Sequence, residues 1–105
     1  MTPRAVFTII CISLSAAGQA GAQDIAAGEA LYQSVCRNCH GPKAQGLASY
    51  PKLSDKDATF LQIRLEQYRA GERIGPNSPL MIPHARDLTD DDIANLTGYI
   101  TTAFQ

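Results

Sequence analysis

Cys36-Arg37-Asn38-Cys39-His40 follows the C-x-x-C-H pattern in which c-type haem is attached to a polypeptide. Two thiols three positions apart lie on one helical turn, close enough to add to the two vinyl groups of a single porphyrin. The histidine that follows then lies beneath the iron and offers an imidazole nitrogen as an axial ligand. The sequence therefore predicts one covalent haem c, held at Cys36 and Cys39, with His40 as an iron ligand.

The first 22 residues have the order of a secretory signal peptide. Arg4 supplies a positive charge, the run from Val6 to Leu14 is almost continuously apolar, and Ala20-Gly21-Ala22 follows in small residues. The apolar run is shorter than the roughly 20 residues that a membrane-spanning helix needs, which makes an uncleaved anchor the weaker alternative. We therefore predict cleavage after Ala22, export to the periplasm and no stable membrane anchor in the mature protein.

Residues 23–105 are predicted to form a single small domain. They keep eight of the nine Lys and Arg, because only Arg4 lies before them, and all ten Asp and Glu, so their formal charge is −2. This balance excludes a nucleic-acid binder that works by neutralising phosphates. Cys11 belongs to the signal segment, which leaves two cysteines in a compartment that oxidises thiols. A domain this small buries a limited core and is often completed by a metal or cofactor.

Three other interpretations of the two cysteines compete with haem attachment. A redox-active C-x-x-C needs a βαβ context, which this sequence does not predict. A zinc site needs four ligands; Cys36, Cys39, His40 and His84 would supply them, but the rest of the chain does not resemble a zinc module. A disulfide between Cys36 and Cys39 would close too small a loop to add much stability. Export together with the C-x-x-C-H pattern favours covalent haem.

Periodicity and capping residues predict three helices and no strand. These are Asp24 to Val35, Asp55 or Asp57 to Ala70, and a third that begins at Thr89. Residues 36–53 are rich in Gly, Pro, Ser and Lys and are predicted to be a loop. Residues 73–87 contain three prolines and are therefore not a continuous helix. We predict an all-α domain of three to four helices with long loops that enclose one haem.

The second axial position has two candidates, Met81 and His84. Met81 lies in a proline-bounded stretch, predicted to be a loop that holds the thioether over the second haem face. A Met thioether opposite a His raises the reduction potential, as an electron carrier requires. Core packing is the usual role of methionine, but Met81 is the only Met in residues 23–105. We predict Met81 as the ligand, with His84 or an open site as alternatives.

Taken together, these residues resemble the small single-haem class I cytochromes c of bacteria, over nearly the whole of residues 23–105. The motifs that carry the resemblance are Gly28 and Tyr32 before C-x-x-C-H-G, Tyr50-Pro51-Lys52-Leu53, the middle segment from Phe60 to Arg73, Met81 to Asp90, and Leu96 with Tyr99. Many relatives carry Gln where this chain has Arg64.

The resemblance implies the class I cytochrome c fold, in which the terminal helices cross and the haem lies with one edge exposed. It implies that Gly28 lets those helices approach closely, and that the Pro51 carbonyl accepts a hydrogen bond from His40 and so orients the imidazole. It also selects Met81 as the second ligand and suggests Arg73 as a contact of a haem propionate.

Filled axial positions indicate a periplasmic electron carrier, not an enzyme, because no substrate reaches the iron. Its partners would be periplasmic redox proteins that dock weakly at the haem edge, and we expect a monomer. One alternative is a haem c subunit of a periplasmic dehydrogenase, for example one that oxidises a sulfur compound. Another is an enzyme or gas sensor with an open iron site.

Overall fold

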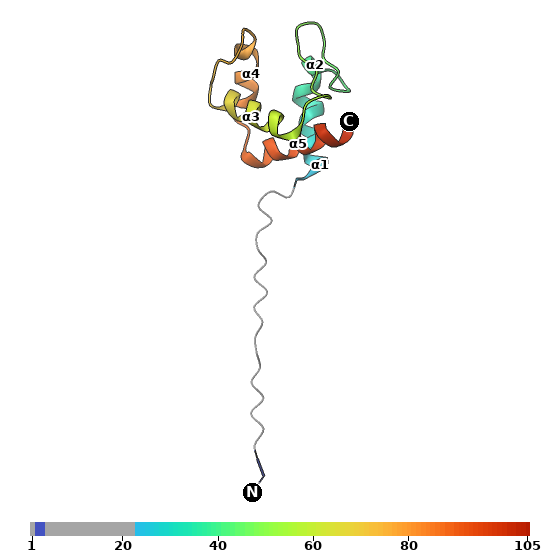
Figure 1. Cartoon of the computed structure of the whole chain (residues 1–105), viewed down its shortest axis with the longest axis vertical. Coiled ribbons are helices and arrows are strands. Elements are labelled where there is room, and N and C mark those ends of the chain that lie inside the picture. The colour runs from blue at the N-terminus through green and yellow to red at the C-terminus, as the bar shows by residue number, and fades with distance from the viewer. Residues whose placement is uncertain (1, 4–22) are drawn as a thin grey trace.

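The computed structural model describes residues 2, 3 and 23–105 of the chain (Figure 1). The predicted signal peptide, residues 1–22, lies outside the described residues except at positions 2 and 3, so the signal and its cleavage site stay predictions. Every regular element of the described part is a helix, and only an isolated bridge between Leu47 and Tyr50 has β geometry. The predicted all-α fold class is confirmed.

The first helical segment runs without a break from Ile25 to His40. It comprises α1 (Ile25–Leu31), the π-helical turn η1 (Tyr32–Cys36) and α2 (Arg37–His40). The Asp24 carboxylate caps its start by accepting a hydrogen bond from the Ala27 N–H at 3.0 Å. Gly41 ends it with a φ of +89°, a left-handed conformation that glycine adopts without strain.

The predicted end of this helix at Val35 is wrong, since residues 36–40 are helical and not part of the loop. In η1 the Arg37 N–H bonds to the Tyr32 carbonyl, five residues back, which shifts the helical register in the middle of the segment. This shift obscures the 3.6-residue period on which the prediction rested. The correction places Cys36 and Cys39 on one helical run, the arrangement their spacing requires.

Helix α3 (Ala58–Arg69) follows the predicted middle segment closely. Asp57 caps it by accepting a hydrogen bond from the Phe60 N–H at 2.7 Å. Gly71, with a φ of +79°, follows its last turn. Its last residue, Arg69, forms an ion pair with the first residue of the C-terminal helix, because Nη1 lies 2.8 Å from the carboxylate of Asp90.

Helix α4 (Ser78–Ala85) corrects the expectation of a loop around Met81. Pro79 lies in the first turn, where a helix does not use the N–H that proline lacks. Pro83 lies inside the helix, in its last turn, so the prolines shorten the helix rather than prevent it. The rest of residues 73–87 is irregular, as predicted.

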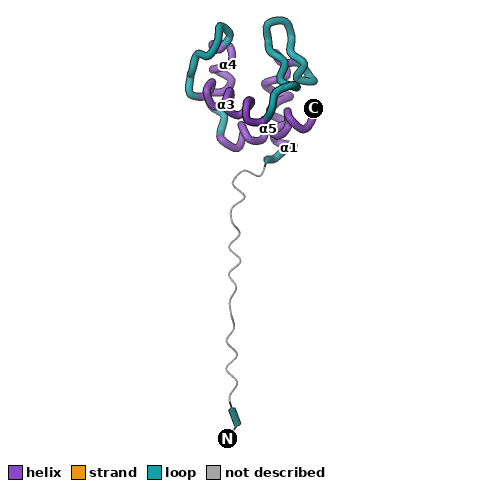
Figure 2. The backbone as a smooth tube through the Cα atoms, viewed as in Figure 1, coloured by secondary structure: helices purple, strands orange, loops and turns teal. Residues whose placement is uncertain are grey.

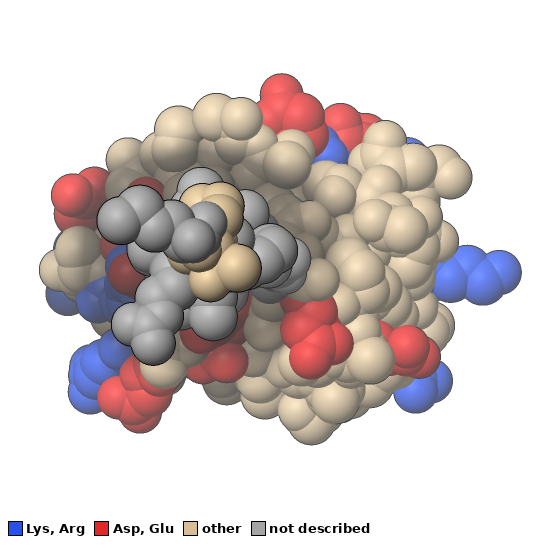
Figure 3. All heavy atoms as spheres, turned by 90° about the horizontal axis from the view of Figure 1, so that it is seen from below, with Lys and Arg blue, Asp and Glu red and all other residues tan. Residues whose placement is uncertain are grey.

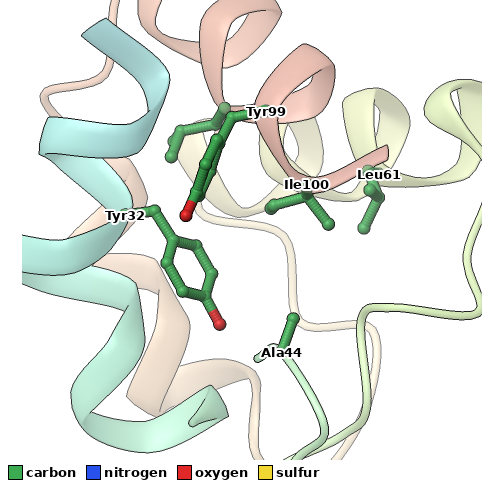
Figure 4. Close-up of a cluster of buried hydrophobic side chains, with 6 residues drawn as sticks. Tyr32, Ala44, Leu61, Tyr99 and Ile100 are labelled. Atoms are coloured by element: carbon green, nitrogen blue, oxygen red, sulfur yellow. The ribbon is translucent and has the colours of Figure 1, made fainter. Parts of the chain in front are cut away.

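Helix α5 (Asp90–Ala103) begins where predicted, with a capping box at Thr89. It crosses α1 at Gly28, where an added Cβ would clash with the Asn95 carbonyl oxygen and lie 2.9 Å from Cβ of Tyr99. Tyr32 and Tyr99 pack beside this crossing with ring centroids 5.6 Å apart. Figure 4 shows their place in the buried cluster, which also contains Ala44, Leu61, Leu96 and Ile100.

The helices leave their loops on one side of the domain. In Figure 1, α1 and α5 lie at the base, α3 and α4 rise on one side, and α2 with its loop rises on the other. Figure 2 shows that the long connections 41–57 and 70–77 extend upward from this base. The two sides face each other across the main cavity of the molecule, because residues of both line it.

Candidate functional site

A cavity of about 510 Å³ lies between the α2 side and the α3–α4 side of the domain. Its size is within the range of about 300–1,000 Å³ typical of cofactor pockets. Among the described residues that line it, none is Lys, Arg, Asp or Glu. Apolar and aromatic side chains form much of its wall, among them Leu31, Val35, Leu65, Tyr68, Leu88 and Leu96. Such a wall suits a flat apolar macrocycle.

The residues predicted as haem contacts lie in this wall, with one exception. Those that line the cavity are Cys36, Cys39, His40, Pro51, Met81 and His84. Arg73 is exposed in the connection after α3 and is not among the lining residues. The structure therefore brings together residues from η1, α2, the following loop and α4, which the sequence separates by up to 48 positions, from Cys36 to His84.

His40 is held in one orientation. Its ring is 5 % exposed, and Nδ1 lies 2.8 Å from the carbonyl oxygen of Pro51. A carbonyl oxygen only accepts, so Nδ1 carries the hydrogen and donates it. The other nitrogen, Nε2, then keeps its lone pair and has the form that binds a metal.

Cys36 and Cys39 are half-buried and not joined in a disulfide. Burial raises the pKa of the Cys36 thiol to about 11, so this thiol is neutral at physiological pH. A redox-active C-x-x-C pair depends on the opposite effect, a lowered thiol pKa. In residues 2, 3 and 23–105, no three His, Cys, Asp or Glu side chains cluster as a metal site. The pair suits thioether attachment best.

Met81 and His84 both reach the cavity from α4 but differ in their surroundings. Met81 is half-buried and also lines a smaller adjoining cavity together with His40. His84 is exposed and lines only the larger one. The structure thus favours Met81 as the group that faces His40.

Two positioning residues were missed in the sequence. Ser78 is buried at the start of α4, and its Oγ accepts hydrogen bonds from the N–H groups of Ile74 and Gly75, both at 2.9 Å. The hydroxyl of Tyr32 donates to the Gly41 carbonyl at 2.6 Å, directly after His40. A serine beside a proline was the only local signal for the first of these contacts. The second depends on the packing of distant turns.

The fold and the cavity define a small helical domain for c-type haem, and comparisons with known proteins agree. Residues 23–100 match the family described as "Cytochrome C oxidase, cbb3-type, subunit III". Cytochrome c-554(548) of Halomonas halodenitrificans is 44 % identical over 82 residues, covering 77 % of this chain and 98 % of that protein. Cytochrome c-554(547) of Halothiobacillus neapolitanus is 36 % identical over 89 residues, with the same coverage.

A further relative is the thiosulfate dehydrogenase electron acceptor of Stutzerimonas stutzeri, 34 % identical over 71 residues. That match covers 67 % of this chain and 33 % of the relative. The chain belongs to the small monohaem c-type cytochromes. It has the all-α cytochrome c fold and carries one covalently attached haem c.

Proposed function

We propose that this cytochrome is a diffusible periplasmic electron carrier in which His40 and Met81 are the axial ligands of a haem attached to Cys36 and Cys39. When bound, the haem supplies a one-electron ferric–ferrous couple. The observation that carries the proposal is the shared cavity, lined by both thiols, by His40 with its Nε2 lone pair free, and by Met81.

In this proposal, protein groups keep both axial positions fixed. The Pro51 carbonyl orients His40, and the Ser78 hydroxyl anchors the loop from which α4 presents Met81. Two fixed protein ligands leave no iron position for a substrate, so the protein carries electrons and is not an enzyme.

Electrons would pass through the mouth of the cavity. Leu80 lines the cavity and is 51 % exposed, so it offers an apolar contact to a docking partner. One exposed side chain suits the small, weak contact of a transient redox encounter. Within the described residues no helix is long and apolar enough to cross a membrane.

The spectrum of the ferric holoprotein tests the axial pair. We expect the weak charge-transfer band that marks a methionine sulfur on ferric haem, and we expect Met81→Ala to abolish it. His84→Ala is the matched control from the same helix and should keep the band. A wild-type spectrum without the band, or a band lost only in His84→Ala, would contradict the assignment.

A second candidate is a haem c subunit of a periplasmic dehydrogenase complex. It is favoured by one relative whose name describes it as an electron acceptor of thiosulfate dehydrogenase. This candidate predicts that the cytochrome co-purifies with a larger oxidoreductase at moderate salt. The diffusible carrier instead elutes alone, as a monomer.

A further inference from the structure

A smaller cavity of about 130 Å³ adjoins the main cavity on the side of α3. The two cavities share the lining residues His40, Pro51, Leu65, Tyr68 and Met81. Neither Cys36 nor Cys39 lines the smaller cavity. It is therefore the part of the haem site next to the proposed iron ligands that the two thiols do not reach.

The positive charges of the haem site are confined to this smaller cavity. Lys52, Lys56 and Arg64 line it, and no Asp or Glu is among its described lining residues. The described lining of the main cavity contains no Lys, Arg, Asp or Glu. A haem has its vinyl groups on two adjacent pyrroles and its propionates on the other two. Thioethers at Cys36 and Cys39 would hold the vinyl edge at η1 and α2, and the propionates would then lie on the side of the haem toward the cations.

Among the three cations that line the smaller cavity, Arg64 is the one that is half-buried and outside the ion pairs found among the described residues. Its Nη1 donates to Gln67 Oε1 at 3.0 Å, and its guanidinium carbon lies 5.1 Å from the centre of the Phe60 ring. These contacts hold the side chain without supplying negative charge.

The charges of the two lysines are already compensated by a counter-ion or by water. Lys56 already has a counter-ion, Asp55, at 3.1 Å, and Lys52 is exposed to water. A half-buried cation without a counter-ion is unfavourable, and a guanidinium binds a carboxylate through two parallel hydrogen bonds. The unused N–H donors of Arg64 therefore match a propionate carboxylate.

We propose that Arg64 binds a haem propionate and fixes the propionate edge of the haem against α3. This inference rests on the proposed attachment at Cys36 and Cys39, and it assigns to Arg64 the contact that the family resemblance suggested for Arg73. A cation held beside the haem disfavours the ferric state, so Arg64 raises the reduction potential. It also lowers the pKa of the propionate that it binds.

The test uses purified holoprotein with Arg64→Gln, Arg64→Lys, Arg73→Gln and Arg86→Gln. Arg86 is exposed and lines neither cavity. Arg86→Gln therefore measures the effect of removing one positive charge from the molecule at a position away from the haem site. Two readouts are measured at low ionic strength: the reduction potential, and the pKa of each propionate followed by NMR of carboxyl-labelled haem.

We expect Arg64→Gln to lower the reduction potential more than Arg86→Gln does, and to raise one propionate pKa by about one to three. Arg64→Lys should keep most of both properties, which separates the charge from any effect on folding. Equal effects of Arg64→Gln and Arg86→Gln, or the shifts appearing in Arg73→Gln alone, would overturn the inference. The methionine charge-transfer band is recorded in every variant, because its absence from the wild type would contradict the axial ligands rather than the role of Arg64.

Discussion

At the scale of single residues, Tyr32 links the haem-binding turn to the core. Its ring is fully buried, and its hydroxyl donates to the carbonyl of Gly41, the residue after His40. Burial raises the pKa of this phenol to about 12. In the unfolded chain the Tyr32 phenol has its ordinary pKa of 10.0, so folding favours the neutral phenol. The stability that this preference contributes is fully present below pH 10 and is lost as the pH rises through about 12.

Tyr32→Phe should therefore lower the free energy of unfolding at pH 7 by about 0.5–1.5 kcal/mol, the net value of one hydrogen bond. Above pH 10 the stability of the variant should fall less steeply than that of the wild type. Denaturant unfolding of the holoprotein between pH 7 and pH 12 measures both effects. Tyr50→Phe is the control and should keep the steep alkaline fall; an identical fall in Tyr32→Phe would contradict the assignment.

At the scale of elements, the crossing of α1 and α5 is the contact that holds the domain together. Gly28 is buried there, with the backbone of Asn95 and the Cβ of Tyr99 where a side chain would otherwise lie. The aromatic rings of Tyr32, Tyr99 and Phe104 pack against one another beside the crossing, with centroids 5.3–5.6 Å apart. Close approach at one glycine thus allows three aromatic rings to pack together.

Gly28→Ala should separate the two helices and lower the free energy of unfolding by about 1–3 kcal/mol, the usual cost of overpacking. Thr102→Ala is the control from α5, since Thr102 is exposed and lines neither cavity, and it should change stability by less than about 0.5 kcal/mol. Guanidinium unfolding of both holoproteins compares them. Equal midpoints for the two variants would show that the crossing tolerates a methyl group.

At the scale of the whole molecule, the helices support a cavity that the protein alone does not fill. The lining of this cavity of about 510 Å³ is mostly apolar, and a bound haem would cover it. Acidic and basic side chains are interspersed on the face in Figure 3, so no single-sign patch there suggests a nucleic-acid partner.

A chain without haem should accordingly lose its fixed tertiary structure. We expect the double variant Cys36→Ser/Cys39→Ser to lose near-ultraviolet circular dichroism and cooperative unfolding while it keeps part of its helix signal. The wild-type chain produced without haem attachment is the control that retains both thiols and should behave alike. Cooperative unfolding of either protein at the holoprotein midpoint would refute this dependence on haem.

Much of the fold could be predicted because its signals are local. The caps at Asp24, Asp57 and Thr89 and the periodicity of α3 and α5 depend on residues a few positions apart. The two errors, the early end at Val35 and the loop assigned around Met81, arose where local rules compete with packing. A π turn shifts the helical period at Cys36, and two prolines lie at positions that a short helix tolerates.

The sequence by itself determined the chemistry of the site, because two thiols and an imidazole at fixed spacing act within one turn of chain. It also indicated Met81 and Pro51 through the family resemblance. Only the tertiary structure decided which distant groups share a cavity. It places the Pro51 carbonyl at Nδ1 of His40 and Met81 in the wall of the same cavity. It also places Arg64, and not Arg73, in the lining of the adjoining cavity. Such proximity depends on how α3 packs on α5 and α4 packs on α3, and no local pattern of residues encodes that packing.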